Sequence, residues 1–319
     1  MGYVFLLIAS LAGISKVVAM KSSGRVCPGE YNSVRINAFR AAICLAVSAV
    51  IFAVGGANAE WDGSWIWLLS GVSNAIMMFA WVLCAERMGL VFVEAFCMVG
   101  SVAIPLFLAP LLFGGETVSI PQWAGVLCLL IALYFLFAKK KEKAPADGAE
   151  ESDAARGTAD AVDARKKNLW IAGLYILLLI LSNAGMSITQ KLYPLRIGKE
   201  YTAFFNLMTF AVVFLCFAAV LIFEKAVHGK SILPENASSG KKLAVLISIA
   251  AVMIYIYSYF ATLAAGELPS AVYYPLTRGV GMLLTVLCDT LIFKQKLTKN
   301  IFIGLIFIFA SILLTNLSF

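Results

Sequence analysis

A polar stripe on one apolar segment is the clearest sign of a binding site in this sequence. Between residues 270 and 292, polar or small side chains recur every three or four positions, which places them on one face of a helix: Ser270, Tyr274, Arg278, Gly281, Thr285 and Asp289. Arg278 is only about 4.5 Å along the helix axis from the segment's midpoint. A buried arginine there needs water, a partner or a ligand. We expect it to contact an anionic substrate group; a structural bond to a carbonyl or carboxylate is the alternative.

Aromatic and polar residues on other apolar segments could complete such a site. We expect Tyr274, Tyr255, Tyr259, Trp81, Asn74 and Ser101 to line a cavity with Arg278, supplying walls and hydrogen bonds. The same spacing rule gives a wider set of facing residues: Ser70, Met77, Cys97, Asn183, Ser187, Gln190 and Thr262. Any one of these side chains could instead serve as an interhelical hydrogen bond, a common role in membrane helices.

Two carboxylates and several prolines add to this hypothesis. Glu94 and Asp289 are the acidic residues inside apolar segments, and either could carry a coupling proton if desolvation raises its pKa. An interfacial carboxylate is the alternative for both. The helix-breaking candidates are Pro105, Pro110 and Pro275. Interrupted helices at matching places in two halves of a chain are typical of a central transport site.

Most enzymatic chemistry is disfavoured. The seven cysteines form no Cys-x-x-Cys pair, and His228, the single histidine, lies in a hydrophilic loop. This pattern predicts no metal site and no cofactor. Nucleotide-hydrolysing and esterase motifs are missing from the sequence. The net charge of +7 comes from basic residues in loops, so it indicates membrane orientation rather than nucleic-acid binding.

The elements that position these residues are ten apolar segments. The chain has 319 residues, of which 61% are hydrophobic and 13% charged, far from the composition of a soluble domain. Each predicted span is long enough to cross a bilayer: residues 3–20, 36–55, 64–85, 90–113, 119–138, 169–190, 202–223, 243–265, 270–292 and 300–317. We therefore predict an all-α membrane protein with ten transmembrane helices.

A charged segment divides the spans into two groups of five. Residues 139–168 hold eight basic and seven acidic residues without an aromatic one, so we expect a disordered linker between a first half, residues 1–138, and a second half, residues 169–319. Some residues match between the halves, including Gly100 with Gly279 and Gly125 with Gly304. Since five is odd, a duplicated five-helix unit must insert with opposite orientation, which predicts an inverted repeat.

Lysine and arginine counts predict the orientation. Nineteen fall on the linker's side of the predicted spans and three on the other, so the linker should be cytoplasmic and both termini outside. We expect a multi-pass protein of the cell (plasma or inner) membrane. Lys16 and Arg40 lie inside spans near the cytoplasmic boundary, where long side chains can reach the interface.

The pattern resembles the drug/metabolite transporter superfamily, specifically its EamA type. The resemblance is carried by Leu268-Pro269-Ser270-Ala271, by Phe293-Lys294-Gln295-Lys296-Leu297-Thr298 with Gly304, and by the first-half counterpart Phe113-Gly114-Gly115-Glu116-Thr117-Val118-Ser119 with Gly125. It implies a ten-helix alternating-access carrier with a central cavity. Gln295 stands where the family's second-repeat hairpin typically carries a glutamate. Many family members keep both termini cytoplasmic, whereas the charge count here predicts the reverse.

The sequence therefore favours a secondary transporter of a small polar metabolite, such as an amino-acid-like molecule or an organic anion. Its partners would be that metabolite, the lipid bilayer and a coupling proton. A flippase for lipid-linked intermediates or a membrane scaffold subunit is the alternative. An intramembrane enzyme is least favoured, because the sequence shows no nucleophile–base pair or metal cluster.

Overall fold

The structure, a computed structural model, describes residues 1–27, 30–88, 93, 96–116, 118–137, 158–234, 239–291 and 299–316. These residues form helices and their connections, without a strand. The elements are α1 (Gly2–Val26), α2 (Glu30–Val54), α3 (Ser64–Met88), the π-helix η1 (Val99–Ala103), α5 (Ile104–Leu112), α6 (Ile120–Phe137), α7 (Thr158–Arg196), the 3₁₀ turn η2 (Lys199–Tyr201), α8 (Thr202–His228), α9 (Gly240–Glu267), α10 (Ser270–Leu291) and α11 (Lys299–Asn316). The all-helical prediction is confirmed for the described chain.

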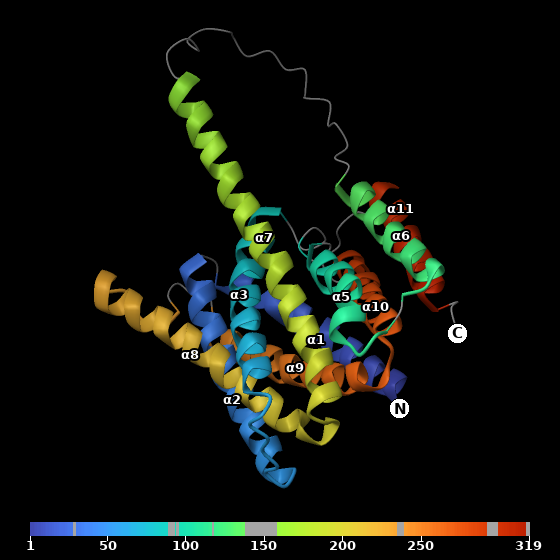
Figure 1. Ribbon diagram of the computed structural model, residues 1–319. Helices are drawn as coiled ribbons and strands as arrows, with labels where there is room; N and C mark the ends of the chain where they lie inside the picture. Colours follow the sequence, from blue (N-terminus) through green and yellow to red (C-terminus); the bar gives the residue numbers. More distant parts are fainter. Residues whose placement is uncertain are drawn as a thin grey trace.

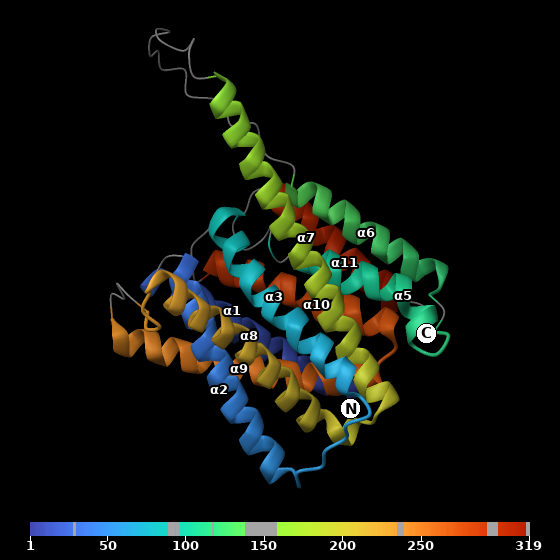
Figure 2. The same ribbon diagram turned by 60° about the vertical axis from the view of Figure 1, so that its left-hand side comes forward.

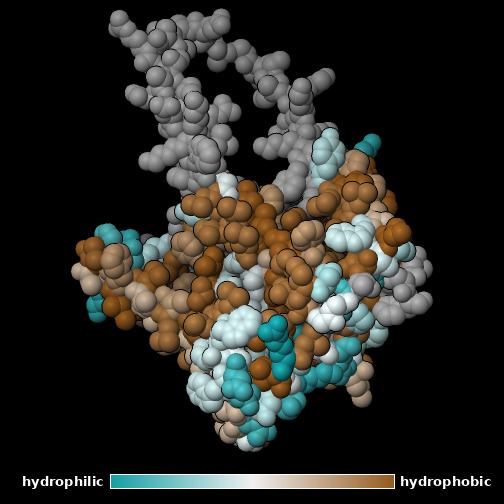
Figure 3. Space-filling view, in the orientation of Figure 1, coloured by the Kyte–Doolittle hydropathy of each residue, from teal (hydrophilic) through white to brown (hydrophobic). Residues whose placement is uncertain are grey.

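Apolar segments of the expected lengths account for these helices. Seven are long and apolar enough to cross a membrane, and three shorter apolar helices cover residues 96–112, 120–132 and 302–314. Large apolar side chains cover much of the exterior, including Phe107, Leu215 and Ile222, and Figure 3 shows the broad hydrophobic surface. An apolar exterior of this extent suits lipid rather than water.

The bundle has two ends, and the helices cross it in both directions. At the end that we call the amino-terminal end, the Met1 amino group and Lys199 both contact Glu267. At the opposite end, the linker end, Val26 packs with Leu243. Consequently α1, α3, α8 and α10 run away from the amino-terminal end, while α2, α7 and α9 run towards it (Figures 1 and 2).

Small residues allow the helix axes to approach closely. A Cβ on Gly100 would collide with the backbone of Ile180, so only glycine lets η1 pack against α7. Gly185 on α7 similarly lies against Ser73 of α3. On the periphery, α6 and α11 form a separate pair (Figure 1), in which Phe135 stacks on Phe307 with ring centroids 5.6 Å apart.

The fourth span is irregular near Pro105, whereas helices α5 and α10 continue through Pro110 and Pro275 without a break. Pro105 is the second residue of α5, which begins where the π-helix η1 ends, and its ring would clash with the carbonyl of residue 101 in a regular α-helix. Widening the preceding turn into a π-helix relieves that clash. Pro110 lies inside α5 and Pro275 inside α10, where it is buried.

Two expectations need correction. Helix α7 begins at Thr158, so residues 158–168 of the expected linker are helical; alanines alternate there with acidic residues before basic ones, an order that suits the start of a helix. Residues 139–157 lie outside the described part of the chain.

Arg40 does not extend to an interface, because it is buried. Its guanidinium donates to Asn37 Oδ1 at 2.7 Å and to Ser23 Oγ.

Candidate functional site

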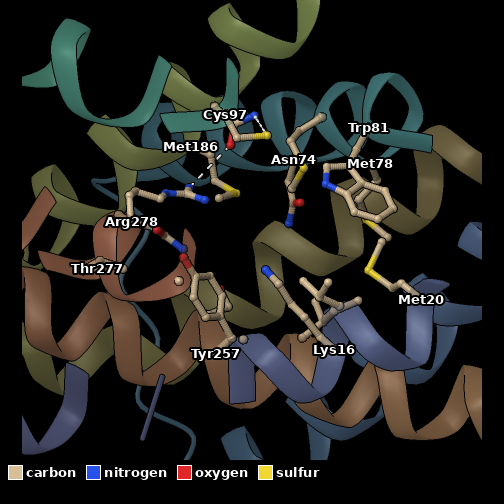
Figure 4. A pocket seen from close by; sticks show the side chains of 18 of the residues that line it. Lys16, Met20, Asn74, Met78, Trp81, Cys97, Met186, Tyr257, Thr277 and Arg278 are labelled. Atoms are coloured by element: carbon tan, nitrogen blue, oxygen red, sulfur yellow. Dashed lines mark hydrogen bonds between the residues drawn. The ribbon is translucent and has the colours of Figure 1, made fainter. Parts of the chain in front are cut away.

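A cavity lies in the centre of the bundle. Its walls come from α1, α3, α7, α9, α10 and the residues just before η1. The lining residues are Ser10, Gly13, Lys16, Val17, Met20, Asn74, Met77, Met78, Trp81, Cys97, Asn183, Met186, Gln190, Ile254, Tyr257, Ser258, Thr277, Arg278 and Gly281. Helices far apart in the sequence thus enclose one space, and Figure 4 shows its side chains.

Three of the seven predicted substrate-binding residues line this cavity: Arg278, Asn74 and Trp81. Figure 4 shows Arg278 reaching into the space from α10, with Asn74 and Trp81 on the α3 side. Met77, Cys97, Asn183 and Gln190, from the wider set of facing residues, lie there too.

The other four predicted residues lie elsewhere. Tyr274 is buried and donates to the carbonyl of Ser187 at 3.2 Å. Tyr255 and Tyr259 stack on each other, with centroids 6.0 Å apart, beside a core formed with α2 and α8. Ser101 donates to the carbonyl of Cys97 at 2.6 Å. Each four-residue step turns about 40° around a helix, so Tyr274 has drifted off the face on which Arg278 lies.

Sequence reasoning missed two important lining residues, Lys16 and Tyr257. We expected Lys16 to reach the interface, but its side chain lies over the Tyr257 ring, with Nζ 3.8 Å from the centroid. Ser10, Gly13, Val17 and Met20 all line the cavity. Their intervals of three and four residues were the available signal, because they place Lys16 beside a face of small and thioether side chains.

Arg278 is positioned by a chain of polar contacts. Its Nη2 donates to Asn183 Oδ1 at 3.4 Å. The amide nitrogen of Asn183 donates to the carbonyl of Leu179 at 2.8 Å and contacts Cys97 Sγ at 3.4 Å. Because both amide hydrogens are directed to those acceptors, the amide oxygen is the atom left to face the guanidinium.

The described lining of the cavity combines two basic side chains with apolar and neutral polar ones. Lys16 and Arg278 carry positive charge, and the described lining residues include no aspartate, glutamate or histidine. Met20, Met77, Met78, Met186 and Trp81 supply polarizable walls, which adapt to varied apolar shapes. The arrangement can bind an anion with a carbon skeleton. Within the described residues, no cluster of histidine, cysteine, aspartate and glutamate side chains could hold a metal ion.

The proposed proton-coupling residues are not placed. Glu94 lies outside the described residues, and so does Gln295. Asp289 is part of α10, but the structure does not describe the position of its side chain. Their roles therefore stay predictions.

Charged contacts join several segments at the amino-terminal end. Lys191 on α7, only 2% exposed, donates to the carbonyl of Leu268 at 2.5 Å and lies 3.4 Å from Glu116 Oε1. The other carboxylate oxygen of Glu116 accepts from the backbone N–H of Ser270 at 2.9 Å. This cluster of Glu116, Lys191, Leu268 and Ser270, which we call the Glu116–Lys191 cluster, ties the loop before α6 to α7 and to the start of α10.

Comparison with known proteins informs the fold only. No family model matches the sequence, and no curated protein matches it. Solved structures do match: a crystal structure described only as that of a protein superposes with a TM-score of 0.63 at 17% identity, covering 99% of this chain and 96% of that chain. The same helical architecture therefore occurs along nearly the full length of another protein.

Proposed function

We propose that this protein is a secondary transporter that moves a small polar, anionic metabolite across a membrane by alternating access. The observation that carries the proposal is the central cavity, which holds Arg278 and Lys16 inside a bundle with an apolar exterior. Charged side chains inside a membrane bundle commonly mark substrate pathways.

The helix directions support an inverted repeat. Three helices of the first half run opposite to their counterparts in the second half. Helices α1 and α3 run away from the amino-terminal end while α7 and α9 run towards it, and α2 and α8 show the reverse. An inverted repeat gives a carrier two related conformations, open to opposite sides.

The helix pairings support the same repeat. Exchanging each helix for its counterpart turns the α1–α9 pair into the α7–α3 pair, and the α2–α9 pair into the α8–α3 pair. The α2–α8 and α6–α11 pairs map onto themselves. All of these pairs are in contact, as a pseudo-twofold arrangement requires. The EamA-type resemblance is consistent with this arrangement and forms part of the proposal.

The Glu116–Lys191 cluster supports one closed end. It joins the loop before α6 with α7 and α10 through an ion pair whose lysine is buried. Met20, Trp81 and Cys97 extend the cavity lining towards the linker end. In the alternating-access cycle this conformation is the one closed at the amino-terminal end. Opening that end requires the cluster to separate.

Orientation completes the proposal. The linker end carries Lys21, Arg25, Arg35, Lys225, Lys230, Lys241 and Lys242, against Lys191, Arg196 and Lys199 near the other end. We propose that the linker end faces the cytoplasm and both termini face outward in the cell membrane. Glu94 or Asp289 would carry a coupling proton.

A flux assay in proteoliposomes tests the function. Purified protein is reconstituted and loaded with a mixture of organic acids, amino acids and neutral metabolites, and release is followed by mass spectrometry. We expect release of anionic compounds by the native protein and loss of that release in Arg278→Ala. Lys241→Gln, an exposed position, is the control and should transport normally. Equal release from native and protein-free vesicles would contradict the proposal, and lipid translocation without solute release would favour a flippase.

A further inference from the structure

Gly281 is a glycine inside a helix whose presence is not explained by close packing. Glycine is less favourable than alanine within a helix, and close contacts explain its use at other positions of the bundle. A Cβ on Gly100 would collide with the backbone of Ile180, and a Cβ on Gly279 would collide with the side chain of Ile312. A Cβ on Gly281 meets nothing within 4 Å. Because Gly281 lines the cavity, the space beside it is part of the cavity.

The space beside Gly281 lies on one particular side of Arg278. The two residues are three positions apart on α10, so they occupy neighbouring turns of one helix face. Helix α10 runs away from the amino-terminal end, and Gly281 therefore lies nearer the linker end than Arg278 does. A ligand whose anionic group is bound at Arg278 can extend a second group over Gly281 towards the linker end.

The lining on the other side of the cavity offers two amides. Asn74 precedes Trp81 on α3, and Gln190 follows Asn183 on α7, so the directions of these helices place both amides towards the amino-terminal end. Asn74 is 6% exposed and Gln190 is 4% exposed. Within the described part of the chain, no hydrogen bond involves either side chain. Each amide can therefore bind a polar group of a ligand.

Apolar side chains predominate on the linker side of the cavity. Met20 follows Ser10 on α1, and Ile254 precedes Ser258 on α9, which runs in the opposite direction. Both apolar residues thus lie nearer the linker end than the polar residue of the same helix, as Trp81 does on α3. Figure 4 shows Met20 and Trp81 close together on that side. We call this part of the cavity the apolar subsite; its residues are Val17, Met20, Trp81, Ile254 and Gly281.

We infer that the cavity binds an organic anion that carries an apolar group, and that Gly281 provides the space in which this group enters the apolar subsite. The inference rests on the proposed function, because it places the anionic group at Arg278. It adds the orientation of the ligand, with polar groups towards the amino-terminal end and the apolar group towards the linker end. A large side chain at position 281 would fill the subsite and leave the surroundings of Asn74 and Gln190 unchanged.

Two ligands of equal charge test the subsite. Lactate and 2-hydroxyisocaproate share an α-hydroxy carboxylate and differ by three apolar carbons. Calorimetric titration of the protein in nanodiscs should give a Kd at least about tenfold lower for 2-hydroxyisocaproate, because each buried methylene adds to the affinity. Empty nanodiscs correct for partition of the ligands into lipid. Equal affinities in the native protein, or binding of neither compound, would overturn the inference.

Variants locate the subsite at position 281. Gly281→Leu should reduce the preference for 2-hydroxyisocaproate to about twofold or less, with lactate bound within about twofold of the native affinity, because the leucine occupies only the space of the apolar group. Gly173→Leu makes the same exchange at an exposed position of α7 with nothing within 4 Å of its Cβ, and it should change neither affinity. A Gly281→Leu protein, shown to be folded by its unfolding temperature, that keeps the native preference or weakens both ligands equally would exclude Gly281 from the subsite.

Arg278→Ala separates this inference from the transport proposal. It should weaken the binding of both compounds, whereas Gly281→Leu should weaken only that of the longer one. Binding in nanodiscs that depends on ligand length in this way, without flux in proteoliposomes, would refute transport but support the subsite. Flux of anions that is independent of ligand length in both the native protein and Gly281→Leu would support transport and refute the subsite.

Discussion

Lys16 and Lys191 are two lysines on apolar helices whose surroundings differ completely. Lys191 on α7 is 2% exposed and is satisfied within the protein by Glu116 and the carbonyl of Leu268. Lys16 on α1 lines the cavity and lies over an aromatic face. A lysine paired with a carboxylate stabilises the fold, whereas a lysine that lies over an aromatic ring at a cavity can bind a ligand. Lysine thus contributes to the contacts that close one end of the bundle, and at the centre it supplies a positive charge that can bind an anion.

The largest expected effect is on the stability of the protein, through the ion pair of Lys191. Glu116→Gln should lower the free energy of unfolding by about 3 kcal/mol, because it removes the carboxylate from a buried lysine. Chemical denaturation in detergent micelles measures the change. Asp62→Asn, at an exposed position, should shift the value by less than about 0.5 kcal/mol, and an equally small shift in Glu116→Gln would show that the ion pair is not structural.

The next largest effect is on transport, at Arg278. Arg278→Ala should reduce anion affinity about a hundredfold, or about 2.7 kcal/mol, since truncating one partner of a buried charge pair typically costs that much. Binding titration and flux both report it. Arg278→Lys should lose less, because it retains the charge without the planar fork. Native affinity in Arg278→Ala would place the substrate elsewhere.

Replacing each lysine by methionine sharpens the contrast directly. Lys16→Met should weaken anion binding about tenfold, or about 1.4 kcal/mol, with little change in unfolding. Lys191→Met should do the opposite and lower stability while substrate affinity changes little. The two measurements are made on the same preparations, and similar profiles for the two variants would remove the distinction between a structural and a ligand-binding lysine.

The smallest effect concerns the ring beneath Lys16. Tyr257→Leu should weaken anion binding about threefold, close to the roughly 0.5–1 kcal/mol of a typical exposed cation–π contact. Tyr257→Phe keeps the ring and should bind as the native protein does. If Phe and Leu weakened binding equally, the hydroxyl rather than the ring face would be the important group.

Most of the fold could be predicted from the sequence, since runs of apolar residues specify membrane-length helices almost alone. Arg278 could be predicted as well, because burying an arginine so deep in an apolar segment is costly unless it meets water, a partner or a ligand. The sequence could not predict that Tyr257 rather than Tyr274 lines the cavity, because the rotation of a helix about its axis depends on packing against neighbours such as Ser187. Lys16 was missed because depth along a helix does not reveal whether a long side chain points to an interface or a cavity.

The start of α7 shows a different limit. Composition distinguishes residues 139–168 from the apolar spans, but many of the residues in this segment are also good helix formers. Once a long helix is nucleated by its apolar part, extending it by one residue is inexpensive. Helix α7 therefore continues outward to Thr158, further than hydropathy alone indicates.

Site-directed labelling tests alternating access most directly. Gly281 lines the cavity, and a Cβ there meets no atom within 4 Å, so Gly281→Cys can be introduced into a protein whose seven native cysteines are replaced. Gly240→Cys and Asn58→Cys, at exposed positions near opposite ends, report each side separately. We predict that a membrane-impermeant maleimide modifies the thiol of Gly281→Cys from both sides, with the balance shifted by substrate. Labelling from one side alone, with or without substrate, would contradict alternating access.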